Sequence, residues 1–416
     1  MSRRVRLERD TLWLSTTDIM VLLVGIVVHV ILTQTFTDGN YGRWVLLLDL
    51  YYVLSTIIDL GLPTLIGRDS ERLGKSAHDF VNRSVRIQIQ FALPVIIVGG
   101  IVGWAWVGGS KEWLIAAYIL VIAACLQILA YAHRAALRAL GESRKEAVVR
   151  LVDRGFTAIG IVLAVSITGA APIPLALATF VGPLVAILIA FKLGEKRLLM
   201  VEGETVELEI SNSSNRELIQ FGLPFLFASI ALVVNIRIEK LLLGVISNPA
   251  EVEVFQIAWL AFIAGYAIII SLRAVLLSWF GEVRHDPVKL NERRVRTRLL
   301  LIPATVIGII IGFTLGRAAI GWTFPDYAED ARPVFSLLLI AWGFAMIASE
   351  PLTTIQIGER PSIYAGILWI GICVDVFVCI LLIPSSGVYG AAIGASFGAV
   401  SVLGLAIGNV SSLRSI

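Results

Sequence analysis

Twelve long apolar segments constrain this chain more than any other feature. A helix that crosses a lipid bilayer needs roughly 20 mostly apolar residues, and twelve stretches meet this requirement. They are residues 12–36, 43–66, 87–107, 112–133, 145–168, 172–193, 217–246, 252–279, 299–320, 331–356, 361–383 and 387–410. Composition agrees, because 57% of the 416 residues are hydrophobic and only 16% are charged, against about 25% charged in soluble proteins. We therefore expect an all-α polytopic membrane protein.

The basic residues indicate how these segments are oriented. Most of the 34 Lys and Arg residues lie in the N-terminal tail and in every second connection, beginning with the one after the second segment. Because cytosolic loops are enriched in Lys and Arg, we expect both termini in the cytosol and the protein in the cell membrane. The segment 12–36 is longer than the apolar core of a signal peptide, so we expect it to remain as the first helix. The net charge of +3 is too balanced to indicate a nucleic-acid partner.

Polarity along the chain indicates two halves. The most polar stretch, 194–216, contains the acidic run VEGETVELE and separates 1–193 from 217–416. We predict an N-terminal six-helix bundle, a cytosolic linker at 194–216 and a C-terminal six-helix bundle. The fourth and tenth segments end in similar sequences at Gly141-Glu142 and Gly358-Glu359. Six segments per half predict parallel repeats related by an axis along the membrane normal.

Ionisable side chains inside the segments are the candidate functional residues. A charge at the bilayer centre costs on the order of 2.5–3.5 kcal/mol on insertion scales, so such residues usually face a partner or a cavity. The set consists of Asp18, His29, Asp49, Asp59, Arg237, Glu239, Lys240, Arg273, Glu350 and Asp375. Taken together, these residues predict a hydrated internal cavity. The four His and three Cys residues show no metal-ligand spacing, and we expect no metal and no catalytic residue.

The seventh segment holds the densest group of these side chains. Arg237 and Lys240 are three residues apart and would share one face of a continuous helix. They could form a cationic wall in the cavity, since the planar guanidinium of arginine binds phosphate oxygens in pairs. The alternative is an internal ion-pair network that fixes the helix register. We predict Arg237 and Lys240, followed by Arg273, as contacts for an anionic headgroup.

The acidic residues have a second predicted role. Asp49 and Asp59 lie ten residues apart in the second segment, and both could border the cavity. Together with Asp18 and Glu239, they are candidates for charge balance against the basic group. They are equally candidates for coupling transport to a proton or a sodium ion. The sequence leaves these roles open.

Several short motifs resemble those of a known family. Residues 37–42 (TDGNYG) end the first loop, 59–62 (DLGL) close the second segment, and Arg68 follows them. The seventh segment opens with 221–224 (FGLP) and closes with 239–244 (EKLLLG). This pattern is similar to that of the polysaccharide-biosynthesis flippases. Glu239 stands where family members usually have Asp.

The resemblance implies a fold and an activity. The implied superfamily includes oligosaccharide flippases and the multidrug and toxic-compound exporters, whose fold is two six-helix bundles facing a central cavity. It implies a membrane transporter without enzymatic activity or cofactor, which moves a polyprenyl-(pyro)phosphate-linked oligosaccharide from the cytosolic to the outer leaflet by alternating access. The implied partners are this lipid substrate, the bilayer and proteins of polysaccharide assembly.

Two other functions compete with this interpretation. The first is cation-coupled export of organic cations on the same fold, which predicts a cavity dominated by carboxylates and aromatic rings. The second is an integral-membrane glycosyltransferase or polymerase, which predicts catalytic residues in an outside loop. The longest such loop is about 316–331 and contains Asp326, Glu329 and Asp330.

Overall fold

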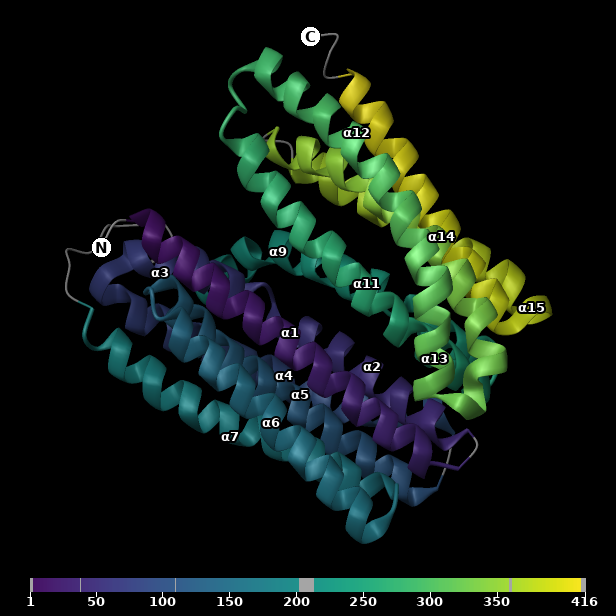
Figure 1. Ribbon diagram of the computed structural model, residues 1–416. Coiled ribbons are helices and arrows are strands. Elements are labelled where there is room, and N and C mark those ends of the chain that lie inside the picture. Colours follow the sequence, from purple (N-terminus) through teal and green to yellow (C-terminus); the bar gives the residue numbers. More distant parts are fainter. Residues whose placement is uncertain (1–2, 38, 109, 202–212, 359–360, 413–416) are drawn as a thin grey trace. The chain divides into compact units, whose positions relative to one another are not determined.

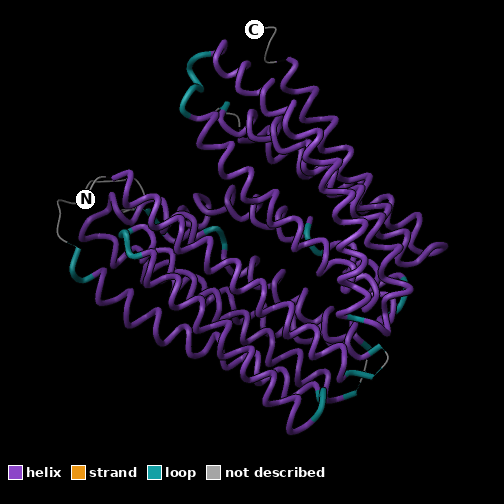
Figure 2. The backbone as a smooth tube through the Cα atoms, viewed as in Figure 1, coloured by secondary structure: helices purple, strands orange, loops and turns teal. Residues whose placement is uncertain are grey.

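The computed structural model describes the chain except residues 1–2, 38, 109, 202–212, 359–360 and 413–416. Throughout the described part, the regular elements are helices joined by loops and turns (Figures 1 and 2). The α-helices are α1 (Arg3–Thr35), α2 (Asn40–Asp59), α3 (Leu62–Leu73), α4 (Ala77–Val107), α5 (Lys111–Ala139), α6 (Ser143–Thr168), α7 (Pro172–Leu198), α9 (Asn215–Asn235), α10 (Ile238–Ile246), α11 (Pro249–Gly281), α12 (Pro287–Ile311), α13 (Arg317–Thr323), α14 (Ala328–Ile357) and α15 (Pro361–Ser412). Three short elements are η1 (Gly74–Ser76), η2 (Gly312–Gly316) and η3 (Pro325–Tyr327).

The helices agree with the predicted all-α membrane fold. Within the described residues, nine helical stretches are long and apolar enough to cross a membrane. One of them, Ser362–Val410, covers the last two predicted segments, and α1 contributes a shorter apolar stretch, Ile19–Thr35. The predicted segment 145–168 lies in α6, whose first half carries Glu146, Arg150, Asp153 and Arg154 and is therefore less apolar.

The structure corrects two of the predicted continuous segments. The segment 43–66 is divided between α2 and α3 and the segment 217–246 between α9 and α10, whereas the segment 299–320 lies within one helical stretch, Pro287–Thr323, that includes η2. Between α2 and α3, both Leu60 and Gly61 have positive φ, at 54° and 71°. Such a left-handed pair cannot continue a right-handed helix. In α15, Gly387 has φ 52°, and it interrupts the helix where the sequence predicts the last two segments to meet.

Contacts divide the chain into two compact units. Unit 1 comprises residues 1–37 and 46–233, and unit 2 comprises residues 38–45 and 234–416. In unit 1, α5 packs against α3, α4 and α7, and α6 packs against α1 and α7. In unit 2, α14 packs against α11, α12 and α15, and α10 packs against α15. The division into six-helix bundles at 193 and 217 stays a prediction, and residues 202–212 of the predicted linker lie outside the described residues.

Apolar side chains cover the outside of the long helices. Leu188 on α7, Ile302 on α12 and Leu381 on α15 are all exposed. In water such surfaces would be unfavourable, but in lipid they face an apolar solvent. Because the backbone groups of a helix are paired within the helix, helices with apolar surfaces are suited to a bilayer.

Hydrogen-bonding caps mark helix ends at the loops. Asp286 accepts a hydrogen bond from the backbone N–H of Lys289 at 3.1 Å at the start of α12. This bond lowers the pKa of the Asp286 carboxyl, so the cap is ionised at neutral pH. Asn248 caps α11 in the same way, through the N–H of Glu251 at 3.1 Å. Such caps satisfy backbone donors that lack a partner within the helix.

Two of the family-like motifs pack against each other in unit 1. Gly61 from the DLGL motif meets Gly222 from the FGLP motif, and a Cβ on either glycine would collide with backbone atoms of the other motif. Leu60, Leu62 and Leu226 belong to one buried cluster around this contact. The absence of side chains therefore permits a close backbone approach between α3 and α9.

A buried carboxylate in each unit binds several arginines. In unit 1, Glu146 is fully buried, and its Oε1 lies 3.5 Å from Arg134 Nη2, 3.7 Å from Arg138 Nη1 and 3.5 Å from Arg150 Nη2. These residues lie in α5 and α6, around the turn predicted to be cytosolic. Because a lone buried charge is costly, this cluster ties the two helices together.

The corresponding cluster in unit 2 joins α12 to α14. Arg294 Nε lies 2.6 Å from Glu350 Oε1, and Arg298 Nε lies 2.7 Å from Glu350 Oε2. The Arg294 and Glu350 side chains are only 6% and 1% exposed. Glu350 is one of the ionisable residues singled out in the sequence, but its two partners come from the connection before the ninth predicted segment. The structure therefore places Glu350 in an ion-pair network.

Replacing Gly222 by alanine should destabilise unit 1, because the added methyl group has no space beside Leu60. Overpacking of this kind costs about 1–3 kcal/mol. Thermal unfolding of the detergent-purified variant measures the effect. The matched control is Gly155→Ala on α6, where nothing lies within 4 Å of the added Cβ. An unchanged transition temperature for Gly222→Ala would contradict the close contact.

Replacing Glu350 by glutamine should leave Arg294 and Arg298 adjacent without their shared anion. Breaking a buried ion pair from one side costs about 3–5 kcal/mol, and part of this is relieved because Arg298 is 41% exposed. We expect a clear fall in the unfolding temperature, and its partial recovery in the double variant Glu350→Gln/Arg294→Met. The exposed Glu329→Gln serves as control. Equal stability of Glu350→Gln and this control would show that the network contributes nothing.

Candidate functional site

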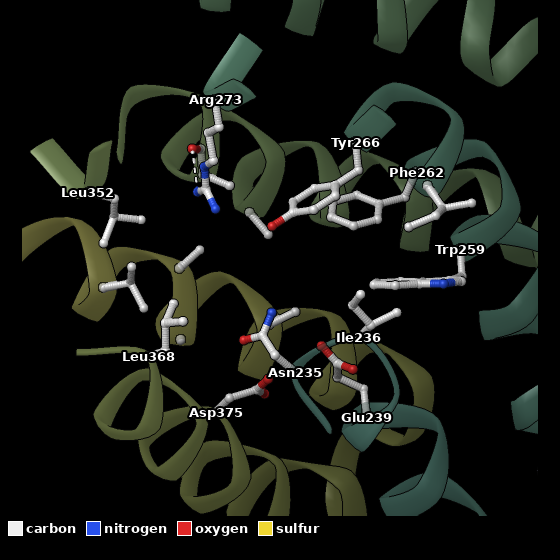
Figure 3. Close-up of a pocket in the computed structure, with 17 residues that line it drawn as sticks. Asn235, Ile236, Glu239, Trp259, Phe262, Tyr266, Arg273, Leu352, Leu368 and Asp375 are labelled. Atoms are coloured by element: carbon white, nitrogen blue, oxygen red, sulfur yellow. Dashed lines mark hydrogen bonds between the residues drawn. The ribbon is translucent and has the colours of Figure 1, made fainter. Parts of the chain in front are cut away.

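A pocket inside unit 2 is the candidate site. Its cavity volume is about 70 Å³. The end of α9, α10, α11, α14 and α15 form its walls (Figure 3). Its polar lining groups are the side chains of Asn235, Glu239, Tyr266, Arg273 and Asp375. The pocket therefore brings polar side chains together between helices, several of which are apolar enough to cross a membrane.

The break between α9 and α10 forms one wall of this pocket. Asn235 ends α9, Ile236 follows it, and Arg237 precedes α10 with φ −131°. The N–H of Arg237 donates to the carbonyl of Val234 at 2.9 Å, which forms a tight turn in place of a helical bond. The side chain of Asn235 can hydrogen-bond to nearby backbone groups and so disfavours a helix. Its Val and Ile neighbours are β-branched, and they also have a low helix propensity. Asn235 and Ile236 therefore face the pocket from an interrupted helix, an arrangement that transporters use at binding sites.

This break corrects the prediction of one continuous helix over 217–246, and it places Arg237 at the N-terminal cap of α10, three residues before Lys240. Arg237 is half-buried at the start of α10 and is not among the residues that line the pocket. Lys240 is buried in α10, and its Nζ donates to Gln256 Oε1 at 2.8 Å. The same ammonium group lies 5.8 Å from the ring centre of Trp259. Lys240 thus holds α10 against α11, and its role as a headgroup contact stays a prediction.

Arg273 is the predicted basic residue that reaches the pocket. Its Nε donates to Ser349 Oγ at 3.3 Å. Its Nη2 donates to the carbonyl of Ala345 at 3.4 Å (Figure 3). Both acceptors are neutral, and among the described residues no carboxylate lies within ion-pair distance of Arg273. In contrast to the arginines around Glu350, Arg273 therefore keeps its charge available to a ligand.

Two carboxyl groups face the pocket from the other side. Glu239 lies on α10 and Asp375 on α15, and both side chains line the pocket (Figure 3). The thiol of Cys379 donates to Asp375 Oδ1, at 3.2 Å. The structure brings the predicted Glu239 together with Asp375, one of the ionisable residues singled out in the sequence.

The remaining predicted acidic residues belong to unit 1 and do not line this pocket. Asp49 is buried on α2. Asp59 ends α2, where its backbone carbonyl accepts a hydrogen bond from Gln88 Nε2 at 3.0 Å. This contact of Asp59 thus stabilises the turn before α3. The side chain of Asp18 lies outside the described residues. Charge balance or ion coupling by these residues stays a prediction.

Three aromatic residues of the site were missed by the sequence analysis. Trp259, Phe262 and Tyr266 line the pocket from α11. Their spacing of three and four residues places them on one face of a helix, which is the signal that could have identified them. An apolar helix in a membrane protein has aromatic residues for many reasons, and only the pocket distinguishes this face. Among the described residues, no group of three or more His, Cys, Asp or Glu side chains could hold a metal ion.

The acidic loop considered for a polymerase does not form one cluster. Asp330 lines a second cavity of unit 2 together with Glu251 and Tyr389. Asp326 and Glu329 are exposed and are not among the residues lining that cavity. The three acidic residues of the loop are therefore not assembled in one described site.

Comparison with known proteins gives the family and the fold. The model of the family described as polysaccharide biosynthesis protein matches residues 7–281. No curated protein sequence matches the chain. Among solved structures, the inward-facing form of a multidrug resistance MATE family transporter of the MOP superfamily has a TM-score of 0.73 and 15% identity, and the match covers 95% of this chain and 96% of that chain.

Two further structures share the fold. The lipid II flippase MurJ in an inward closed conformation has a TM-score of 0.73 and 14% identity over 96% of this chain and 87% of that chain. A MOP superfamily transporter from Pyrococcus furiosus, described as having a binding pocket of reverse polarity, has a TM-score of 0.68 and 15% identity over 99% and 96% of the two chains. The chain is therefore a multi-pass membrane protein that belongs to the polysaccharide biosynthesis protein family and has the fold of the MATE transporters and the MurJ flippase.

Proposed function

We propose that the protein moves a polyprenyl-(pyro)phosphate-linked oligosaccharide from the cytosolic to the outer leaflet of the cell membrane by alternating access. The observation that carries the proposal is Arg273, which lines a pocket among apolar helices and contacts only neutral oxygens there. A guanidinium group binds phosphate oxygens in pairs. The family that matches residues 7–281 is that of polysaccharide biosynthesis proteins, which supports a glycan as cargo.

The physical problem of such transport is the headgroup. A charged, hydroxylated group must cross about 30 Å of hydrocarbon, where an unpaired charge is costly. The pocket offers Arg273 for the phosphate and polar side chains for the sugar, while the polyprenyl tail can stay in lipid. The solved neighbours include a lipid II flippase, a protein whose named cargo is a lipid, which is consistent with this division of the substrate.

The carboxyl pair supplies a candidate for energy coupling. Glu239 and Asp375 both line the pocket, so these carboxyl groups can take up or release a proton or exchange it for a cation. With both carboxyl groups ionised, two negative charges would line the pocket, which changes the charge balance with Arg273. In the proposed cycle, the ion carried by this pair is coupled to the movement of the anionic headgroup.

A second candidate function is cation-coupled export of organic cations. It is favoured by the same pocket, because two carboxyl groups and the aromatic rings of Trp259, Phe262 and Tyr266 line it, and aromatic faces attract organic cations. MATE transporters among the solved neighbours share the fold. Against this candidate stands Arg273, which would repel a cation at one end of the pocket.

Reconstitution tests the proposal directly. Liposomes containing the protein would carry a fluorescent polyprenyl pyrophosphate-linked disaccharide, and a membrane-impermeant quencher would report its arrival in the outer leaflet. Arg273→Gln should slow this arrival about tenfold or more, because a hydrogen-bonded charge contributes about 1.5–3 kcal/mol. The exposed Arg296→Gln on α12 is the control. Arg237→Gln and Lys240→Gln, measured alongside, test the predictions for these two residues.

Ion coupling and cargo are resolved in the same liposomes. Imposed proton and sodium gradients should accelerate the wild-type protein but not Glu239→Gln. Tetraphenylphosphonium serves as the competing cargo. Export of this cation, together with no flipping of the lipid under any gradient, would replace the proposal by the second candidate.

A further inference from the structure

The second cavity of unit 2 lies at one end of its helices. Its volume is about 670 Å³, within the roughly 300–1,000 Å³ of ligand-binding pockets. Three parts of the chain form its walls, namely the junction of α10 and α11 within 246–254, the start of α14 at Asp330, and residues 383–389 around the break in α15. The sequence predicts all three as outside connections. The cavity therefore lies at the end of unit 2 that we expect to face outward.

The carboxyl group of Glu251 has unused hydrogen-bonding capacity in this cavity. Its Oε2 atom is buried and has no hydrogen-bond partner among the described residues. The carboxyl group lies against Gly387, where a Cβ would collide with it, and Gly387 also has φ 52°. A buried acceptor without a partner is unfavourable. The cavity therefore favours a ligand that donates a hydrogen bond to Glu251.

The charge of this cavity is opposite to that of the first pocket. Asp330 is the second carboxyl group that lines it, and none of its described lining residues is Lys, Arg or His. With both carboxyl groups ionised, the cavity would repel a phosphate. In the first pocket, Arg273 contacts only neutral oxygens and attracts a phosphate. The two cavities thus suit different chemical parts of one headgroup.

The other polar groups of the cavity can both donate and accept hydrogen bonds. They are the hydroxyl groups of Ser247, Ser385, Ser386 and Tyr389 and the amide of Asn248. Apart from Ser247, these residues are exposed, so a ligand can reach them. A hydroxyl group has one donor and two acceptor positions, and an amide also has both kinds. Such a mixture matches the hydroxyl groups of a sugar, whereas an organic cation would use only the two carboxylates.

Glu251 and Arg273 lie toward opposite ends of the same helix. α11 extends over Pro249–Gly281, and the path from Glu251 to Arg273 corresponds to about 33 Å of helix at 1.5 Å per residue. This length is close to the thickness of the hydrocarbon core, about 30 Å. A headgroup that leaves Arg273 toward the outer leaflet would therefore move toward the end of unit 2 that holds the second cavity.

We infer that the cavity around Glu251 and Asp330 is a binding site for the uncharged sugar rings of the headgroup at the outer face. This inference rests on the proposed function, and it assigns the sugar and the phosphate to separate sites. The two carboxylates accept hydrogen bonds from sugar hydroxyl groups, and the serine and asparagine side chains complete the contacts. The phosphate stays out of this cavity because of its charge.

Protection of an introduced cysteine tests the site. Ala250 lines the cavity and is exposed, so Ala250→Cys in proteoliposomes should react with a membrane-impermeant maleimide. The exposed Cys373 is replaced by alanine, and Cys125 and Cys379 are buried. N,N′-diacetylchitobiose, a neutral disaccharide, should slow the reaction. The same disaccharide carrying an anomeric phosphate should protect about fivefold less well or worse, because the carboxylates repel it.

Carboxyl variants distinguish sugar binding from altered packing. Glu251→Gln and Asp330→Asn should each raise the disaccharide concentration for half protection about threefold to tenfold. The double variant should also abolish the difference between the disaccharide and its phosphate. Glu329 is exposed and does not line the cavity, so Glu329→Gln should change neither value. Glu329→Cys, used as reporter in place of Ala250→Cys, should react without protection.

The outcomes separate the inference from the proposed function. No protection of Ala250→Cys by the disaccharide, or equal protection in wild type and the double carboxyl variant, would overturn the sugar site, while lipid flipping in the reconstituted system would still support the transporter. Protection by tetraphenylphosphonium but not by the disaccharide would assign the cavity to cations and overturn the inference. Protection by the disaccharide without flipping of any glycolipid would support a sugar site and overturn the proposed function.

Discussion

Charges buried among apolar helices need partners, and this requirement determines how each unit is built. Glu146 is surrounded by three arginines in unit 1, and Glu350 is bound by Arg294 and Arg298 in unit 2. Each cluster joins neighbouring helices, α5 to α6 and α12 to α14. In a membrane, where apolar contact with lipid competes with contact between helices, such paired charges give the helices a defined arrangement.

Against this background, the pocket of unit 2 is the exception. Its arginine, Arg273, has neutral acceptors, and its two carboxyl groups, Glu239 and Asp375, line the same pocket. Neither arrangement neutralises charge in the way that the two clusters do. A protein that retains such groups among apolar helices bears a cost in stability, which is understandable if a ligand or an ion completes the pairing during transport.

Interruptions of the helices position both the packing contacts and the pocket. The left-handed pair Leu60–Gly61 ends α2 and lets the backbone of Gly61 approach Gly222. The break at residues 235–237 turns Asn235 and Glu239 toward the pocket. The DLGL and FGLP motifs, which resemble those of the family, thus have structural roles. Their glycines, Gly61 and Gly222, allow the two backbones to approach closely.

The sequence by itself determined the class of fold and the family. Long apolar segments with polar connections can form only membrane helices, since backbone groups in lipid must pair within the chain. Ionisable residues within those segments pointed to Glu239, Arg273, Glu350 and Asp375, because a charge at membrane depth is conspicuous in any sequence. The pattern could not show which of these charges neutralise one another, since that depends on residues far apart in the chain.

The tertiary structure alone decided which side chains meet. It placed Glu350 in an ion-pair network with arginines from a predicted connection, and it placed a helix break before Arg237 and Lys240. It also selected one aromatic face of α11 from an apolar helix whose other residues look similar in sequence. The physical reason is that pairing and cavity lining depend on distances across helices, whereas sequence periodicity reports only which residues share one helix face.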